Sequence, residues 1–166
     1  MAYLIEWVDQ VEDSFGPEVC VKMNTPAGLL YQHWRGDVIC STTWFVNSNI
    51  HDFSNQTSLE LKLDSSSIDV IPVKLLKQGS LFQQKVWAEL LIIPSGKTLT
   101  YSEIAVKLSS SPRAVGNACR ANPYPFLIPC HRVVAVSSLG GYSGQTVGPL
   151  MVIKETLLSH ELMNQA

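Results

Sequence analysis

Residues 100–134 read TYSEIAVKLSSSPRAVGNACRANPYPFLIPCHRVV, and this stretch decides the fold of the C-terminal half of the chain. Thr100 and Glu103 match a capping box, which predicts a short helix that runs through Leu108. Three serines then form a turn, and Pro112 suits the first position of a second helix because its missing N–H costs nothing there. Two short helices joined by a tight turn indicate a helix-turn-helix.

The second of these helices runs from Arg113 to about Ala121 and stops before Asn122-Pro123. Its polar side chains stand among small ones, and the residues concerned are Arg113, Asn117, Arg120, Ala114 and Gly116. Small side chains let a helix approach another surface closely. From the pattern alone, that surface is either DNA or a neighbouring helix.

The loop after the second helix delivers a cysteine flanked by a histidine and an arginine. Prolines at positions 123, 125 and 129 give this loop a rigid, non-regular path to Cys130, His131 and Arg132. A histidine base or a nearby positive charge lowers the pKa of a thiol and favours the nucleophilic thiolate. The pattern therefore points to a nucleophilic cysteine, and the alternative is a core cysteine beside a surface His-Arg pair.

Further helices are predicted on both sides of this stretch. Ser80 and Gln83 form another capping box, and apolar residues recur at helical spacing from Phe82 to Ile93. The sequence Pro94-Ser95-Gly96 ends this helix. A last helix is predicted at about 149–163.

The N-terminal half has the texture of a sheet. The segments 19–23, 29–34 and 38–44 are rich in β-branched and aromatic residues and are separated by turn residues, which predicts a three-stranded antiparallel meander. Residues 59–63 alternate, 65–67 read as a loop, and 68–76 are either another strand or a connection. The fold class is therefore α/β of the α+β kind, with a small antiparallel sheet domain at 1–78 and a mainly helical domain at 79–166.

Composition limits the class of protein. The chain has 166 residues, of which 46% are hydrophobic and 16% charged, with a net charge of −2. This composition excludes intrinsic disorder, and no window approaches the roughly 18 apolar residues that a membrane span needs. The first thirteen residues carry acids and no basic residue, which is the wrong charge for a signal or transit peptide. We expect a cytoplasmic protein in a bacterium, or a nuclear one in a eukaryote.

Charge and cysteines are distributed unevenly. Five basic and ten acidic residues precede Gly79, a net of −5, whereas seven basic and four acidic residues follow, a net of +3. The positive half suits contact with a phosphate backbone. The four cysteines form no C-x-x-C pair. Cys20, His33 and Cys40 are conceivable metal ligands, but their intervals match no usual zinc spacing, so we expect no metal.

The sequence around Cys130 resembles the active-site signature of the O6-alkylguanine-DNA alkyltransferases, also called methylated-DNA–protein-cysteine methyltransferases. The signature is Pro-Cys-His-Arg-Val at 129–133. Further family motifs are matched in the same order, at 82–87, 93–96, 100–105, 113–116, 122–123, 141–144 and 154–161. The resemblance runs from about Gly79 to Glu161, and the N-terminal half is similar only in general character.

The resemblance implies a DNA repair enzyme that acts once. A winged helix-turn-helix domain binds duplex DNA in the minor groove, after a ribonuclease-H-like domain at 1–78. The damaged guanine is flipped out, and the Cys130 thiolate takes the alkyl group from its O6 atom. The substrate is O6-alkylguanine in duplex DNA, with O4-alkylthymine as a further candidate. The product is a stable thioether, so a monomer without cofactor or metal is consumed in one turnover.

Residue roles follow from the same resemblance. Cys130 is the acceptor, His131 draws the thiol proton through a water, and Glu161 orients that histidine. Asn122 holds the turn before Cys130, and Tyr101 hydrogen-bonds the flipped guanine. The residues implied to contact DNA are Arg113, which fills the space of the flipped base, and Ala114, Gly116, Asn117 and Arg120. Those implied to form the lesion pocket are Pro129, Tyr142, Ser143, Gly144 and Lys154.

The sequence departs from the family pattern in three places, one of which is the stretch from Cys130 to Tyr142, where the chain is about one residue shorter than usual. The approach to Arg113 is shorter than usual, which alters the turn of the helix-turn-helix. Gln145 replaces the second glycine after the pocket serine, and several extra residues stand between Gly144 and Lys154. This insertion forms a longer lid, changes the size of lesion that is accepted, or weakens repair.

Other classes of function remain as alternatives. A non-catalytic protein that binds alkyl lesions and flags them for other repair factors is one, although relatives of that kind lack the cysteine. A transcription regulator that uses the same helix-turn-helix is another, and such relatives usually carry an extra sensor domain. A thiol hydrolase is disfavoured, because no oxyanion-hole glycine run accompanies Cys130.

Overall fold

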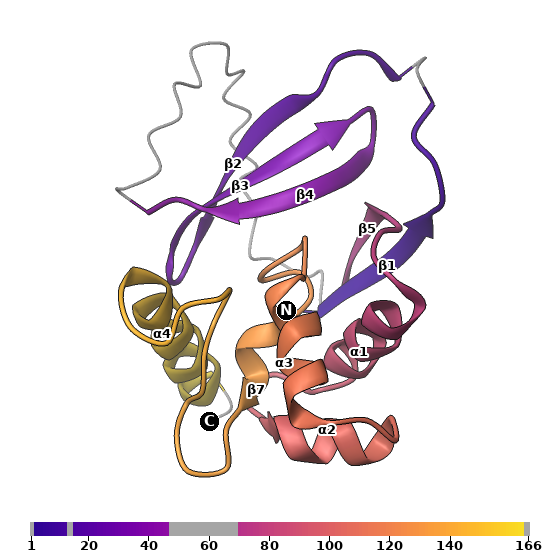
Figure 1. Ribbon diagram of the computed structural model, residues 1–166. Helices are drawn as coiled ribbons and strands as arrows, with labels where there is room; N and C mark the ends of the chain where they lie inside the picture. The colour runs from indigo at the N-terminus through magenta and orange to yellow at the C-terminus, as the bar shows by residue number, and fades with distance from the viewer. Residues whose placement is uncertain (1, 13–14, 47–69, 165–166) are drawn as a thin grey trace. The chain divides into compact units, whose positions relative to one another are not determined.

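Three antiparallel strands form the centre of the N-terminal sheet. They are β2 (Val19–Thr25), β3 (Gly28–Arg35) and β4 (Val38–Trp44), paired in chain order as the sequence predicted. β2 alternates between buried and more exposed positions, whereas β3 and β4 also bury neighbouring residues. The buried apolar residues of the three strands are Val21, Met23, Leu30, Tyr31, Val38, Ile39 and Trp44. The predicted meander is confirmed, and Figure 1 shows its three strands side by side.

Two further strands extend this sheet in parallel. β1 (Ala2–Val8) pairs with β5 (Val70–Leu76), and β5 also pairs with β4, which gives the order β1-β5-β4-β3-β2. No strand is predicted at β1, and residues 68–76 are predicted to be either a strand or a connection. Parallel neighbours need a crossover connection, so neither strand has a hairpin turn to announce it.

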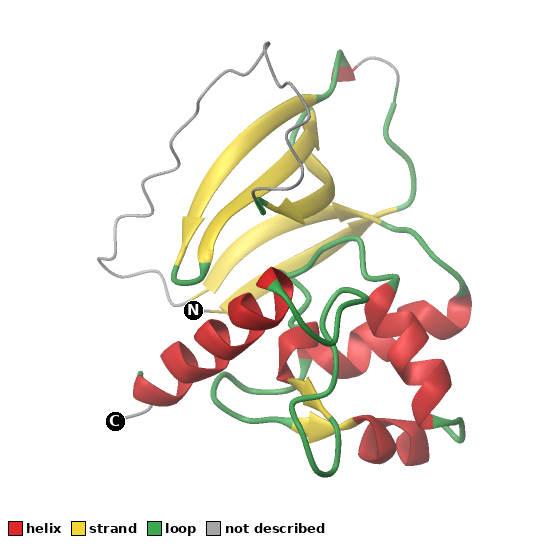
Figure 2. Ribbon diagram, turned by 60° about the vertical axis from the view of Figure 1, so that its left-hand side comes forward, coloured by secondary structure: helices red, strands yellow, loops and turns green. Residues whose placement is uncertain are grey.

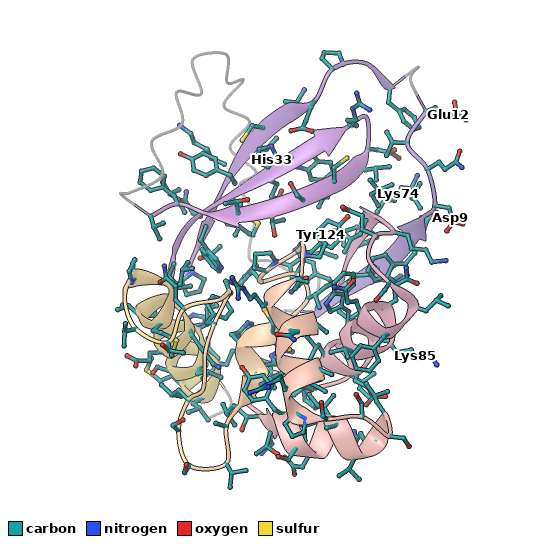
Figure 3. The ribbon with its side chains drawn as sticks, in the orientation of Figure 1. Asp9, Glu12, His33, Lys74, Lys85 and Tyr124 are labelled. Carbon is teal, nitrogen blue, oxygen red and sulfur yellow. The ribbon has the colours of Figure 1, made fainter. Side chains whose placement is uncertain are left out.

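The computed structural model describes residues 2–12, 15–46 and 70–164. The expectations for 59–63 and 65–67 lie outside these residues. His33 lies on β3, as Figure 3 shows, opposite Cys20 of β2, and its Nδ1 is 2.9 Å from Oε1 of Glu18. Among the described residues, no group of three His, Cys, Asp or Glu side chains is placed to hold a metal ion.

The chain divides into two compact units, Met1–Gln78 and Gly79–Ala166. The second unit begins with α1 (Leu81–Leu91), whose capping box between Ser80 and Gln83 is present as predicted. The helix ends at Leu91, slightly before the Pro-Ser-Gly sequence that was expected to end it. Its buried face consists of Val86, Trp87 and Leu90.

The predicted helix-turn-helix is formed by α2 (Tyr101–Lys107) and α3 (Pro112–Arg120), which Figure 1 shows next to α1. The Thr100–Glu103 capping box starts α2. The Ser111 hydroxyl accepts the Ala114 amide at 3.2 Å and starts α3. The Trp87 ring of α1 donates to the Ala118 carbonyl of α3 at 2.9 Å, which fixes α3 against the core.

A short parallel sheet and a last helix complete the second unit. β6 (Leu99–Thr100) pairs with β7 (Val133–Val134), and a single 3-10 turn, η2 (Cys130–Arg132), leads into β7. None of these three short elements was predicted. The last helix, α4 (Pro149–Met163), has the predicted bounds. Figure 2 shows the small sheet among the helices, where it brings the start of α2 beside the strand that follows Cys130.

Across the described residues, no helix has the length and apolar character that crossing a membrane requires.

Candidate active site

Cys130 stands at the end of a loop that one asparagine holds in shape. The Nδ2 atom of Asn122 donates to the Ile128 carbonyl at 2.9 Å and to Cys130 Sγ at 3.4 Å. Its Oδ1 accepts from the amide of Tyr124, which Figure 3 labels, at 2.9 Å. Cys130 is only 3% exposed. Asn122 therefore fixes both the path of the loop and the position of the buried sulfur.

The carboxylate of Glu161, on α4, accepts several hydrogen bonds next to Cys130. Oε1 of Glu161 lies 2.9 Å from Nε2 of the buried His131. Arg132 holds the same carboxylate through Nε at 3.1 Å and Nη2 at 2.8 Å, and its Nη1 donates to the Ile93 carbonyl at 2.6 Å. The Gly96 amide adds a bond to Oε2 at 3.0 Å. The carboxylate thus ties α4 to the turn that carries Cys130.

The carboxylate decides which nitrogen of His131 can act as a base. Burial raises the pKa of Glu161, but hydrogen bonds from His131, Arg132 and Gly96 outweigh burial and lower the pKa to about 2. An ionised carboxylate only accepts, so the Nε2 atom of His131 carries the proton in this bond. The lone pair of Nδ1 then stays free, and this buried atom has no hydrogen-bond partner among the described residues. Nδ1 is therefore the nitrogen that can accept a proton.

Burial also controls the charge of the thiol and the imidazole. It raises the pKa of Cys130, against the lowering effects of the Asn122 hydrogen bond and the Lys154 charge. It lowers the pKa of His131 below the ordinary 6.5, although Glu161 acts in the opposite direction. The sequence suggested a thiol pKa lowered by its neighbours, whereas desolvation prevails in the structure. The resting pair is accordingly a neutral thiol and a neutral imidazole.

Lys154 is a fully buried cation that binds backbone oxygens. Its Nζ donates to the carbonyls of Val133 and Leu139, both at 2.6 Å, and of Gly141 at 2.9 Å. Burial lowers the pKa of Lys154 to about 8. The side chain holds β7 and residues 139–141 together, and its charge favours a thiolate at Cys130.

A cavity of about 240 Å³ opens in front of the thiol. Its walls come from Tyr101, from α3 and from the loop 141–146, and the predicted site residues that line it are Tyr101, Gly116, Arg120, Cys130, Tyr142, Ser143 and Gly144. The Tyr101 hydroxyl donates to the Gly141 carbonyl at 3.2 Å. Burial raises the pKa of Tyr101 to about 12, so this hydroxyl remains a donor at neutral pH. The cavity combines a nucleophile, a donor and a nearby cation.

Two predicted pocket residues do not line this cavity. Pro129, the residue before Cys130 in the sequence, is buried outside the cavity lining. Lys154 contacts a lining residue, Gly141, through a hydrogen bond to its carbonyl. A larger hollow of about 490 Å³, beside β7 and α4, contains none of the predicted site residues. The candidate lesion pocket is therefore the smaller cavity.

The helix α3 has one buried and one exposed face. Val115, Ala118 and Cys119 are buried against the unit, whereas Arg113, Asn117 and Arg120 are exposed. The exposed residues recur at helical spacing, so they share one side of α3. Of the smaller residues assigned to DNA, Ala114 and Gly116 are half-buried.

Sequence reasoning missed Cys119 as a residue of the site, and it singled out Gln145 and the segment after it only as departures from the family pattern. Cys119, Gln145 and Thr146 also line the cavity. Arg132 was given no role in the reaction from the sequence, and it shares the carboxylate of the histidine. A charged residue next to the Cys-His pair was a usable signal for Arg132. Nothing in the local sequence distinguished Cys119, because Cys130 is close to it in the folded structure and not in the sequence.

We expect Asn122→Ala to slow any reaction of the Cys130 thiol by at least about tenfold, because the loop loses three hydrogen bonds from one side chain. Thermal unfolding should show a loss of about 1–3 kcal/mol. Asn122→Asp is the matched control, since it keeps an acceptor for Tyr124 but loses both donated bonds and adds negative charge beside Sγ. Its thiol reactivity should recover as pH rises, and an unchanged reactivity profile in both variants would contradict the role given to Asn122.

The comparisons with known proteins point to one family. The model of the 6-O-methylguanine DNA methyltransferase DNA-binding domain matches residues 81–163. The methylated-DNA–protein-cysteine methyltransferase of Methanocaldococcus jannaschii is 53% identical over 87 residues, which cover 50% of this chain and 52% of that protein. The protein of the same name from Methanocaldococcus vulcanius is 44% identical over 110 residues, covering 60% of this chain and 67% of that protein. The matched part thus spans about half the length of the first relative.

Solved structures extend the likeness to the N-terminal unit. The crystal structure of Mycobacterium tuberculosis OGT in complex with DNA has a TM-score of 0.64 and 28% identity, and covers 86% of this chain and 92% of that chain. An O6-methylguanine-DNA methyltransferase from Pyrococcus kodakaraensis has a TM-score of 0.60 and 25% identity, and covers 87% and 99%. From the matched family model and the geometry around Cys130, this chain belongs to the 6-O-methylguanine DNA methyltransferase family.

Proposed function

We propose that the protein removes the alkyl group from O6-alkylguanine in duplex DNA by transferring it to Cys130. The observation that carries this proposal is the buried Cys130 thiol at a cavity, followed by a histidine whose Nε2 is fixed on Glu161. This nucleophile, base and orienter series resembles other activated nucleophiles. The other members of the family that match here bear the name of the same activity.

The proposed step conserves atoms and charge. Nδ1 of His131 accepts the thiol proton, and the Cys130 thiolate attacks the alkyl carbon in line with the bond to O6. The carbon–sulfur bond forms as the carbon–oxygen bond breaks, and the electron pair of the broken bond leaves with guanine. Guanine takes up a proton from water, and protonated His131 returns its proton to the solvent, so the net reaction moves only the alkyl group from oxygen to sulfur. Tyr101 is placed at the cavity as a neutral donor for the departing base. A thioether is not hydrolysed under mild conditions, so one protein repairs one lesion.

The DNA must bring the damaged base to a buried sulfur. The exposed face of α3, with Arg113, Asn117 and Arg120, is the surface we propose for the duplex. A base inside the stack cannot reach Cys130, which is 3% exposed, so the nucleotide is extruded into the cavity. A DNA substrate places the protein with the genome, in the cytoplasm of a bacterium or the nucleus of a eukaryote.

Intact mass spectrometry after incubation with a duplex that contains one O6-methylguanine tests the proposal. The expected result is the gain of a single methyl group, with uptake that stops at one per chain. Trypsin cuts after Arg120, so it places Cys119 and Cys130 in different peptides and shows which thiol reacted. Selective binding of the lesion duplex without any mass gain would instead favour the alternative of a protein that flags damage for other repair factors.

The rate of transfer should fall on the acid side only below pH 6.5. The reaction needs a neutral His131, and burial lowers the pKa of this residue from its ordinary 6.5. The charged groups around it are Glu161, which opposes this shift, and Arg132 and Lys154, which reinforce it. Single-turnover rates between about pH 5 and pH 8 at saturating DNA measure the midpoint. A midpoint at or above 6.5 would assign the acid limb to another group.

A further inference from the structure

The turn at the mouth of the cavity is a two-residue hairpin. The amide of Tyr142 donates to the Gln145 carbonyl at 2.8 Å, and the amide of Gln145 donates to the Tyr142 carbonyl at 2.9 Å. Ser143 and Gly144, between them, have φ angles of 47° and 85°. Positive φ at both central residues is the pattern of a type I′ turn. The turn is thus stiff in itself, and its place over the cavity depends on how its two ends are held.

The first end is held by the buried lysine. The Gly141 carbonyl accepts from Nζ of Lys154 at 2.9 Å and from the Tyr101 hydroxyl at 3.2 Å. Since Lys154 belongs to α4, this end of the turn is tied to the middle of that helix.

The second end is held by a side chain that departs from the family pattern. The Gln145 Oε1 atom accepts from the backbone amide of Leu150 at 3.2 Å. Leu150 lies in the first turn of α4, whose N-cap, Gly148, offers no side-chain hydrogen bond. The side-chain oxygen of Gln145 therefore accepts the Leu150 N–H, a donor at the helix start that the side chain of a capping serine, threonine or aspartate would normally satisfy.

The space around this side chain is shaped to receive it. Gly148 has a φ of 100°, and a Cβ built there would lie 3.3 Å from Oε1 of Gln145. Thr146, Val147 and Pro149 are exposed, so burial does not hold the extra residues in place. The hydrogen bond that Gln145 accepts from Leu150 joins the two ends of this inserted segment. The turn is therefore tied to α4 at both of its ends.

We propose that Gln145 is a positioning residue that fixes the lesion-pocket turn to the start of α4 and thereby limits the size of alkyl group that the cavity accepts. The proposal rests on the proposed alkyl transfer, since Gln145 and Thr146 line the cavity that also holds Cys130. With both ends tied to α4, the position of α4 sets the distance between the turn and α3. With the second end released, the turn can move outward and admit a larger group, while a small group is less well aligned for attack.

Single-turnover rates on duplexes with O6-methylguanine and O6-benzylguanine test this proposal. Gln145→Ala should slow methyl transfer about tenfold and leave benzyl transfer nearly unchanged, so the ratio of benzyl to methyl rates rises about tenfold. Gln145→Glu should keep the wild-type ratio, because a carboxylate accepts the same Leu150 bond and suits a helix N-terminus. Any weaker DNA binding from its charge affects both duplexes alike. Val147→Ala, an exposed change in the same segment, is the control that should leave both rates unaltered.

Hydrogen exchange of the Leu150 amide gives a readout that does not depend on transfer. Exchange should speed up in Gln145→Ala and stay slow in Gln145→Glu. An unchanged rate ratio in Gln145→Ala, or the same shift in both Gln145 variants, would overturn the proposal. If the wild-type protein transfers neither group, the proposed function fails, and the affinities for the two lesion duplexes replace the rates. A Gln145→Ala shift of the affinity ratio toward benzyl then supports the positioning role, and an unchanged ratio overturns it.

Discussion

Cys130→Ala should abolish alkyl transfer to the protein while lesion-duplex binding stays within about threefold of the wild-type affinity, a difference of about 0.7 kcal/mol or less. The thiol is the atom that forms the new bond, so no residual rate is expected from the rest of the machinery. The proposed duplex surface on α3 is untouched by the change. Losing one buried sulfur should cost the fold only about 1 kcal/mol. Quantitative mass spectrometry and a fluorescence binding titration measure the two quantities.

Cys119 makes this a demanding experiment, because the cavity holds a second thiol. Burial raises the pKa of Cys119, and the nearby Cys130 adds to that effect. Its sulfur has neither the bond from Asn122 nor a histidine next in the chain. We therefore expect the Cys119 peptide to stay unmodified in Cys130→Ala. A methyl group on that peptide would show that the cavity, rather than the Asn122–Cys130–His131 arrangement, activates the thiol.

The helices were predictable because their start signals are local. The capping boxes at Ser80 and Thr100 and the proline at position 112 fixed three helix beginnings from a few residues each. The parallel strands had no such signal. β1 and β5 are separated by most of the first unit, and their pairing depends on contacts between distant residues. The short β6–β7 pair likewise joins segments that are far apart in the chain.

The residues of the candidate site were likewise predictable only where the sequence carries a local signal. Cys130 and His131 are adjacent in a proline-fixed loop, so the sequence shows them together. Their partners act through the backbone or from α4. Lys154 binds three carbonyl oxygens, and carbonyls carry no sequence signal. Glu161 was reached only through the resemblance to a family, and the structure supplies the reason for its position: it accepts from His131, Arg132 and Gly96 at once.

Glu161→Gln should lower the rate of transfer about a hundredfold and destabilise the fold by about 3 kcal/mol. The carboxylate accepts bonds from the imidazole, the guanidinium and a backbone amide, and its side chain is only 12% exposed. An amide has one accepting oxygen and turns an NH₂ group toward donors that cannot accept. Arg132 would lose the charge it faces, and His131 would lose the acceptor that fixes its Nε2 proton. Single-turnover kinetics and denaturant unfolding measure the two effects.

The pH dependence separates this charge effect from simple loss of packing. The pKa of Glu161 is lowered from 4.5 to about 2, so its stabilising effect is complete above pH 4.5 and is lost as pH falls toward 2. The difference in unfolding free energy between wild type and Glu161→Gln should therefore shrink across this interval, whereas a packing defect would persist. The same change removes the group that raises the pKa of His131, so the acid limb of the rate should move to lower pH even as its plateau falls. An acid limb that moves to higher pH would show that Glu161 does not act on His131 through its charge.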